Sequence, residues 1–170
     1  MDKPFVAVLM GSDSDLPTMQ ATLDMLTSLS VPWEVKITSA HRTPEKTIEY
    51  VKSAESRGCK VFVAAAGLAA HLAGAVAAHT LRPVIGVPME GGPLSGFDSL
   101  LSTVQMPGGI PVASVAVGKA GAKNAAYLAA QILAIEDEAL FLRLKAERET
   151  NAQQIIAKDE ALQAKIKGNA

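Results

Sequence analysis

Short apolar runs alternate with segments of helical spacing along most of this chain. Several runs, such as 60–67, are apolar at almost every position. A continuously apolar strand is typical of a parallel sheet that is covered on both faces. Between the runs, apolar residues recur every three or four positions, which indicates amphipathic helices. The predicted strands span 5–10, 33–40, 60–67, 83–89 and 112–117.

Prolines and capping residues mark where the helices begin. Pro17 is a good first helical residue, and Thr43 followed by Pro44 marks the start of a helix that ends near Gly58. Strand and helix alternate five times, which predicts an α/β fold: a three-layer, doubly wound parallel sheet of the flavodoxin type. The remaining predicted helices span 68–79, 97–105 and 118–133, and an amphipathic helical segment follows from 136.

The length of 170 residues fits one α/β domain, for which we predict residues 1–135. Residues 136–170 carry no strand signal, and we expect them to form a helical segment that packs on the same or a neighbouring subunit. Hydrophobic residues make up 49% of the chain and charged residues only 19%, so few charged residues are available for the surface. This composition hints at surface buried between subunits.

The formal net charge of −1 and the absence of a basic run disfavour nucleic acid or an anionic membrane as a partner. The longest apolar stretch, 61–78, contains His71 and two glycines and is predicted to be strand plus helix rather than a membrane span. We expect no secretory signal, because no basic segment followed by an apolar one opens the sequence. The lone Cys59 fits a reducing compartment, and we expect a cytoplasmic protein.

The loop after the first strand, 11–15, combines serines with aspartates. A helix N-terminus offers unpaired backbone N–H groups that hold a phosphate without lysine, and Ser12 and Ser14 add hydroxyl donors. The carboxylate of Asp15 is an acceptor and suits ribose hydroxyls. The loop therefore fits a ribose phosphate. In the simpler alternative Asp15 caps the helix and the serines are turn residues, and this loop alone favours that alternative.

The next two loops strengthen the case for a binding site. His41 and Arg42 follow the second strand directly, where an arginine can clamp a phosphate and a histidine can move protons near neutral pH. Gly67 opens the third loop and allows close backbone approach to a ligand, whereas His71 is as compatible with packing as with ligand contact. No residue spacing predicts a metal site or a Ser-His-Asp triad.

Five segments together resemble the N5-carboxyaminoimidazole ribonucleotide mutase family of purine biosynthesis, also called the catalytic subunit of phosphoribosylaminoimidazole carboxylase. The resemblance covers roughly residues 5–135. It implies a flavodoxin-like fold, a homo-octamer with active sites between subunits, and a reaction without ATP, metal or organic cofactor. The resemblance also implies a functional link to an ATP-dependent synthetase. The segments are GSDSD, SAHRTP, GLAAHLAG, LSGFDSLLSTVQMPGGIPVASVAVGKAG and NAAYLAAQILA.

The resemblance also implies a reaction and roles for particular residues. The family moves a carboxylate from the exocyclic nitrogen to ring carbon C4 of an aminoimidazole ribonucleotide, through carbon dioxide. Arg42 and Ser12 would hold the 5′-phosphate and Asp15 the ribose hydroxyls, while His41 would act as acid and then as base. The wider set of candidate substrate contacts is Ser14, Ser39, Gly67, Ala70, His71 and Met106.

Two positions of the third loop depart from the family pattern. Leu68 stands where the family usually has a second glycine, and Ala73 replaces a proline. The segment MEGGPLSG after the fourth strand also differs from the commoner type. Leu68 is the more consequential change, because a side chain stands where backbone was expected to meet the carboxylate.

Three other functions compete with the mutase. The family's second class carboxylates aminoimidazole ribonucleotide directly with carbon dioxide, and Arg42 and His71 favour the mutase over it. A phosphorylatable signalling domain would need an Asp closing the third strand, where the chain has Ala65, Ala66 and Gly67. A flavin-binding electron carrier is disfavoured because the loops lack aromatic residues to stack the ring.

Overall fold

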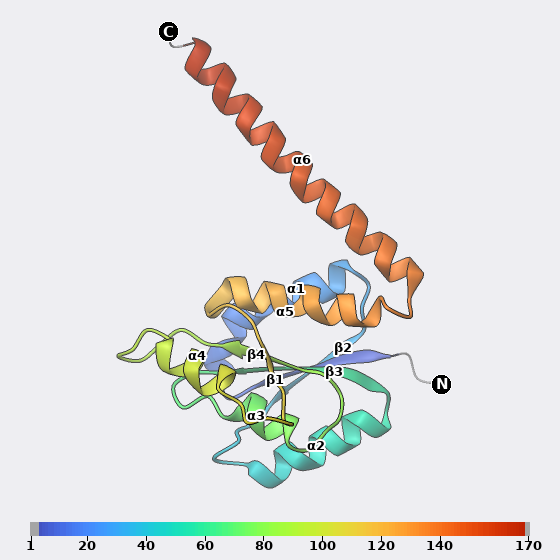
Figure 1. Ribbon diagram of the computed structural model, residues 1–170, viewed down its shortest axis with the longest axis vertical. Helices are drawn as coiled ribbons and strands as arrows, with labels where there is room; N and C mark the ends of the chain where they lie inside the picture. The colour runs from blue at the N-terminus through green and yellow to red at the C-terminus, as the bar shows by residue number, and fades with distance from the viewer. Residues whose placement is uncertain (1–3, 169–170) are drawn as a thin grey trace.

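In the computed structural model, which describes residues 4–168, one five-stranded sheet lies between two layers of helices (Figure 1). All neighbouring strands are parallel, in the order β2-β1-β3-β4-β5. The predicted α/β, doubly wound architecture is therefore confirmed. The strands are β1 (Phe5–Met10), β2 (Trp33–Ile37), β3 (Cys59–Ala66), β4 (Val84–Pro88) and β5 (Ala113–Ser114).

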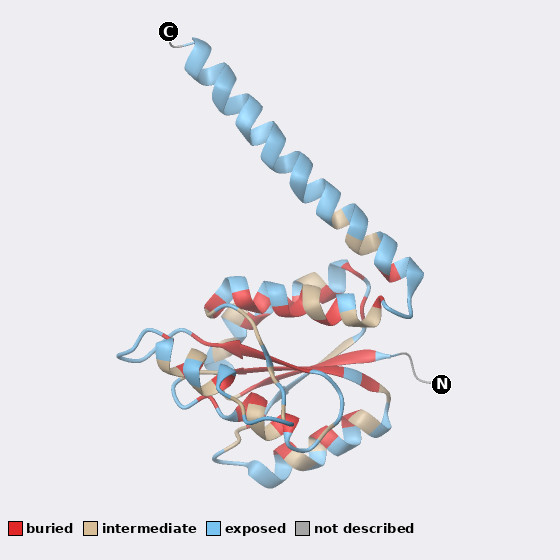
Figure 2. Ribbon diagram, viewed as in Figure 1, coloured by how far each residue is buried: buried red, intermediate tan, exposed pale blue. Residues whose placement is uncertain are grey.

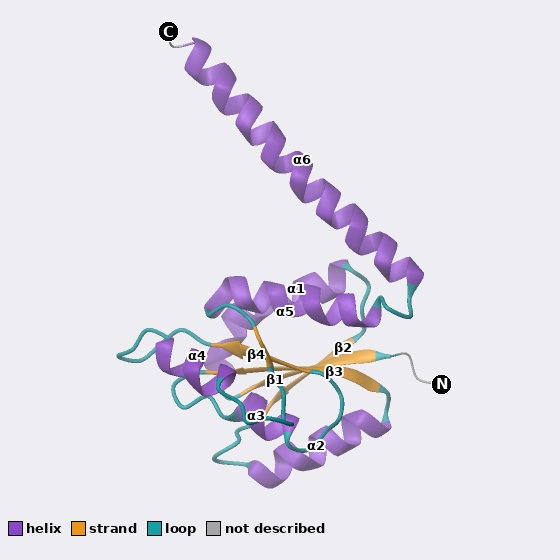
Figure 3. Cartoon of the chain, viewed as in Figure 1, coloured by secondary structure: helices purple, strands orange, loops and turns teal. Residues whose placement is uncertain are grey.

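Helices cover both faces of the sheet. Helices α1 and α5 lie on one face, and α2 and α3 on the other (Figures 1 and 3). A short 3-10 helix, η1 (Asp13–Asp15), precedes α1. The helices are α1 (Leu16–Ser28), α2 (Pro44–Ser56), α3 (Leu72–Ala77), α4 (Phe97–Val104), α5 (Gly118–Leu133) and α6 (Glu138–Gly168).

Strand β1 is the centre of the core, and all six of its residues are buried. Val6, Val8 and Met10 belong to the cluster under α1 and α5. Phe5 and Leu9 belong to the cluster on the opposite face. Because side chains alternate along a strand, a strand buried on both faces must be apolar at every position. Figure 2 shows the resulting buried layer along the sheet.

Three elements are shorter than the sequence predicts. Strand β5 keeps only Ala113–Ser114, and the chain turns into α5 at Gly118, which has a φ angle of 73°. Helix α3 begins at Leu72, so that 67–71 stays a loop. Strand β2 ends at Ile37, after which the buried Thr38 hydroxyl bonds the Thr47 hydroxyl at 2.7 Å.

Helix α6 is attached to the rest of the chain only through its first turns. Leu140 is buried, and Arg143 Nε donates a hydrogen bond to the Leu29 carbonyl at 2.8 Å. The Tyr127 hydroxyl donates to Glu147 at 2.8 Å. All residues from 148 to 168 are exposed, and this part projects away from the sheet (Figure 2). Within residues 4–168, no helix is both long and apolar enough to cross a membrane.

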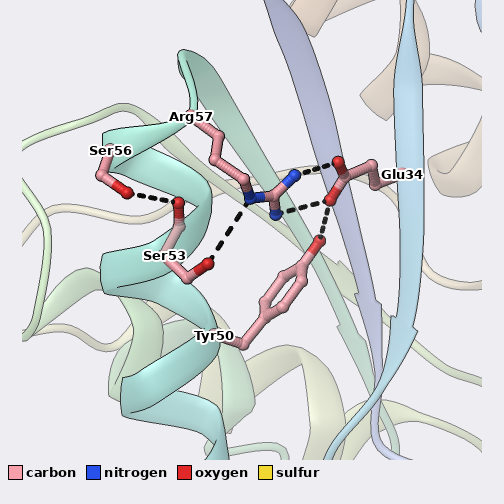
Figure 4. A network of polar contacts seen from close by, with 5 residues as sticks. All are labelled: Glu34, Tyr50, Ser53, Ser56 and Arg57. Carbon is pink, nitrogen blue, oxygen red and sulfur yellow. Dashed lines mark hydrogen bonds and ion pairs between the residues drawn. The ribbon is translucent and has the colours of Figure 1, made fainter.

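A polar network fastens the edge strand β2 to α2 (Figure 4). Arg57, directly after α2, forms a bidentate ion pair with Glu34, and the Tyr50 hydroxyl donates to the same carboxylate at 3.1 Å. The hydrogen bonds from Arg57 hold the pKa of Glu34 below its ordinary value. Burial raises the pKa of Tyr50, which therefore remains a neutral donor. Glu34 and Arg57 lie near the amino ends of β2 and β3, away from the loops described next.

Candidate active site

An open cleft of about 530 Å³ lies at the carboxyl ends of the four strands β2, β1, β3 and β4. Met10 at the end of β1 is level with Ile37 of β2 and Ala65 of β3, so the loops that follow these strands start side by side. Parallel α/β sheets bind ligands at this edge. The predicted site residues that line the cleft are Ser12, Ser14, Asp15, Ser39, His41, Arg42, Gly67 and His71.

The β1–α1 loop presents its serines to the cleft. Ser12 caps η1: its hydroxyl accepts hydrogen bonds from the backbone N–H of Ser14 at 3.2 Å and from the Ser14 hydroxyl at 2.8 Å. Asp15 precedes α1, but its side chain makes no capping hydrogen bond. Burial raises the pKa of its carboxyl group. Asp15 therefore occupies the N-cap position without a capping side-chain bond, whereas Ser12 and Ser14 do form the turn that the simpler interpretation expects.

The β2–α2 loop places a cation beside these serines. The Arg42 backbone N–H donates to the Ser39 hydroxyl at 3.1 Å, and its guanidinium Nη2 donates to the Gly11 carbonyl at 3.2 Å. The Ser39 N–H donates to the Thr43 hydroxyl at 3.0 Å, which fixes the turn before α2. Arg42 thus reaches from the loop after β2 to the loop after β1.

The two histidines of the cleft touch each other. His41 Nε2 lies 2.6 Å from His71 Nδ1, and the rings meet edge to face at 76°. At this distance one nitrogen carries the hydrogen and the other accepts it, so the tautomers of the two rings are linked. His41 follows β2 and His71 follows β3, which flank β1 on either side. The sequence left the role of His71 open, and the structure places it in the cleft.

The β4–α4 loop forms a wall that the sequence analysis did not assign to the site. Met89, Glu90, Gly91 and Gly92 all line the cleft. A Cβ atom on Gly67 would lie 3.5 Å from Met89 Cβ, so the third and fourth loops are in close contact. The signal was present in principle, because this loop follows a strand next to β3 and contains two consecutive glycines.

Two predicted substrate contacts lie outside this cleft. Ala70 is almost completely buried. Met106 packs against α3, with its sulfur 3.2 Å from where a Cβ atom on Gly74 would lie.

Cys59 is also buried; its thiol donates to the Val61 carbonyl, and burial raises the pKa of this thiol to about 11. Across residues 4–168, no group of three His, Cys, Asp or Glu side chains is arranged to hold a metal ion.

The chain is similar to proteins of known name along nearly its whole length. The family described as AIR carboxylase matches residues 5–154. The N5-carboxyaminoimidazole ribonucleotide mutase of Bacillus subtilis is 52% identical over 160 residues, which are 94% of this chain and 99% of that protein.

Two further matches come from a larger protein and from a crystal structure. The bifunctional purine synthesis protein purC/E of Dictyostelium discoideum is 57% identical over 134 residues, which are 79% of this chain and 13% of that protein. The crystal structure of Treponema denticola PurE has a TM-score of 0.85 and 31% identity, over 94% of this chain and 99% of that one. These matches confirm the resemblance seen in the sequence: the chain belongs to the AIR carboxylase family.

Proposed function

We propose that the protein converts N5-carboxyaminoimidazole ribonucleotide into 4-carboxyaminoimidazole ribonucleotide in purine biosynthesis. The observation that carries this proposal is the convergence, in one cleft, of a histidine pair with an arginine, serines and an aspartate. The identity of about half of all residues to proteins named as this mutase supports the same reaction.

The polar end of the cleft binds the ribose phosphate. Arg42 and Ser12 hold the 5′-phosphate, since the guanidinium donates to the carbonyl of Gly11, the residue before Ser12, and both side chains line the cleft. Asp15 accepts hydrogen bonds from the ribose hydroxyls, because its carboxylate makes no capping bond to α1. Ser14 and Ser39 line the same cleft and add hydroxyl groups.

His41 of the histidine pair donates and takes back the one proton that the reaction transfers. When the bond from the exocyclic nitrogen to the carboxylate carbon breaks, the electron pair stays on nitrogen, carbon dioxide forms, and His41 gives the nitrogen a proton. Ring carbon C4 then attacks carbon dioxide, and the C4 proton returns to His41. No net proton is consumed, and one imidazole suffices. His71, in contact with His41, orients its ring.

The test compares two substrates without ATP. N5-carboxyaminoimidazole ribonucleotide is supplied in one reaction, and aminoimidazole ribonucleotide with bicarbonate in the other. Formation of 4-carboxyaminoimidazole ribonucleotide is followed in both. We expect fast product from the first and little from the second. The reverse result would mean direct carboxylation of aminoimidazole ribonucleotide and would overturn the proposed reaction.

We further propose that the protein is a homo-octamer with the cleft near subunit boundaries. Val35 and Ile37 on the edge strand β2 are exposed, and so are Phe97, Leu101 and Val104 on α4. Such exposed apolar side chains are typical of surfaces that are buried on association. We assign residues 136–170 to contacts with a neighbouring subunit beyond the turns that pack on α5. Light scattering should give eight times the mass of one chain, and a monomer would contradict this.

The cellular setting forms part of the same proposal. We propose a cytoplasmic enzyme, in keeping with its single buried cysteine. We also propose that it works in series with an ATP-dependent synthetase, as the fusion of two purine synthesis activities in the Dictyostelium relative suggests by its name. Copurification with such a synthetase, or channelling between the two in a coupled assay, would test this link.

A further inference from the structure

Leu68 has an unusual backbone conformation at the mouth of the cleft. Its φ angle is 54°, in the left-handed region that glycine adopts freely and a bulky side chain does not. Leu68 is nevertheless 56% exposed, so its side chain contributes little to the core. A strained, exposed apolar residue beside a catalytic cleft points to a role of its side chain in function.

The Leu68 side chain bridges two loops of the cleft. A Cβ atom on Gly92 would lie 2.5 Å from Leu68 Cδ2, so the leucine occupies the space above Gly92. Both residues line the cleft, Leu68 from the β3–α3 loop and Gly92 from the β4–α4 loop. Gly92 has a φ angle of 65°, which also favours glycine at this position. The two residues therefore fit together as a pair.

The base of this bridge is fixed by the backbone. The Met89 N–H donates to the Ala66 carbonyl at 2.9 Å, which ties the ends of β4 and β3 together. His71 follows Leu68 by three residues in the same loop and contacts His41. Leu68 therefore lies close to this hydrogen-bonded junction and in the same loop as His71.

We propose that Leu68 is an apolar barrier that retains carbon dioxide in the cleft between the two halves of the reaction. This inference rests on the proposed mutase reaction. Carbon dioxide is uncharged once the nitrogen–carbon bond has broken, so no ion pair holds it, and retention depends on closing its exit with apolar groups. If it escapes, the protonated nitrogen remains and the product is aminoimidazole ribonucleotide.

The test measures exchange of carbon dioxide with the solution. N5-carboxyaminoimidazole ribonucleotide is converted in buffer with ¹⁴C-bicarbonate and carbonic anhydrase. At early times, the label in 4-carboxyaminoimidazole ribonucleotide and the released aminoimidazole ribonucleotide are both measured. A reaction without enzyme corrects for spontaneous loss of the carboxylate. The variants are Leu68→Ala, which keeps a Cβ atom, and Leu68→Gly, which also removes the backbone strain. Leu81→Ala, at a fully exposed leucine that does not line the cleft, is the matched control.

We expect both Leu68 variants to raise the labelled fraction and the released fraction at least about threefold, and Leu81→Ala to change neither. Normal fractions in both Leu68 variants would overturn the inference, as would a rise in Leu68→Gly alone, because backbone freedom would then be the cause. If the unmodified protein forms no product from N5-carboxyaminoimidazole ribonucleotide, the proposed function itself fails.

A second variant tests the pairing with Gly92. Gly92→Ala pushes a Cβ atom into the space that Leu68 occupies, so it should raise exchange by displacing the leucine. In the Leu68→Ala variant, Gly92→Ala should raise exchange little further, because the leucine atoms that it would displace are already absent. Independent, multiplicative effects of the two substitutions would show that the residues do not act as a pair and would overturn this part of the inference.

Discussion

His41 Nε2 and His71 Nδ1 are 2.6 Å apart, although the two residues follow different strands and are separated by 30 positions in the chain. Strands β2 and β3 flank β1, and the loops after them converge above its end. A hydrogen bond between two imidazole rings links their tautomers, because one of the two facing nitrogens carries the hydrogen and the other accepts it. A histidine so oriented is suited to give and retake one proton.

Replacing His41 by Asn should abolish turnover and preserve ribonucleotide binding. Asparagine cannot supply or accept a proton near neutral pH, and loss of a general acid–base group typically costs about 10²- to 10⁴-fold in rate. Turnover and the dissociation constant of the product, measured by calorimetry, check both parts. A variant that no longer binds the ribonucleotide would contradict the assigned role.

Replacing His71 by Ala should lower kcat about tenfold and leave KM nearly unchanged, because His71 acts by holding the ring of His41. His71→Asn, whose amide can hydrogen-bond, should recover part of the loss. Adding His71→Ala to His41→Asn should have almost no further effect on kcat, since residues that act as a unit are not additive. A large rise in KM would instead indicate that His71 binds substrate.

Replacing Arg42 by Lys should weaken ribonucleotide binding about tenfold, because a lysine cannot form the bidentate contact of a guanidinium with phosphate. The measurement is the dissociation constant of the product, together with competition by inorganic phosphate. Arg57→Lys is the matched control: Arg57 pairs with Glu34 at the opposite end of β2 and should affect stability without affecting binding. Equal binding by both variants would exclude Arg42 from the phosphate site.

The ion pair between Glu34 and Arg57 should make stability depend on pH in the acid range. The folded-state pKa of Glu34 lies below its ordinary value of 4.5. The stabilisation by the ion pair is therefore complete above pH 4.5 and is lost as the pH falls through the folded-state pKa of Glu34. Both side chains are partly exposed, so Glu34→Gln should lower the free energy of unfolding by at most about 1 kcal/mol at pH 7.

Urea unfolding of this variant and of the unmodified protein, at pH 7 and at successively lower pH, checks the sign. The difference between the two proteins should shrink as the pH falls below 4.5. A constant difference over the whole range would mean that the charge of Glu34 is not the cause.

Gly121→Ala should destabilise the fold severely. A Cβ atom on Gly121, in the first turn of α5, would overlap the backbone carbonyl of Ala116, and backbone cannot give way as a side chain can. We expect a loss of about 3 kcal/mol or more in the free energy of unfolding. Gly108→Ala is the control, because its Cβ atom would meet nothing within 4 Å. If both variants unfold at the same urea concentration, α5 does not pack as described.

The apolar runs and the capping residues are enough to predict the sheet and the helices around it. An apolar run such as 60–67 can be satisfied only by burial on both faces, and capping residues such as Thr43 and Pro44 mark where the next helix begins. The same local logic placed Ser12, Asp15, His41 and Arg42 at the carboxyl edge of the sheet, where the structure finds them together in one cleft.

Which of these groups touch depends on how the strands are ordered in the assembled sheet. Strand order is not encoded locally, so the contact between His41 and His71 could not be predicted from the pattern. The two glycines of the β4–α4 loop indicate a part in the site only once β4 is known to lie beside β3. The same holds for Met106, which packs on α3 instead of lining the cleft. The periodicity of apolar residues indicates which face of each single helix or strand is buried. A binding site depends instead on the distances between loops, and these follow from the order of the strands in the sheet.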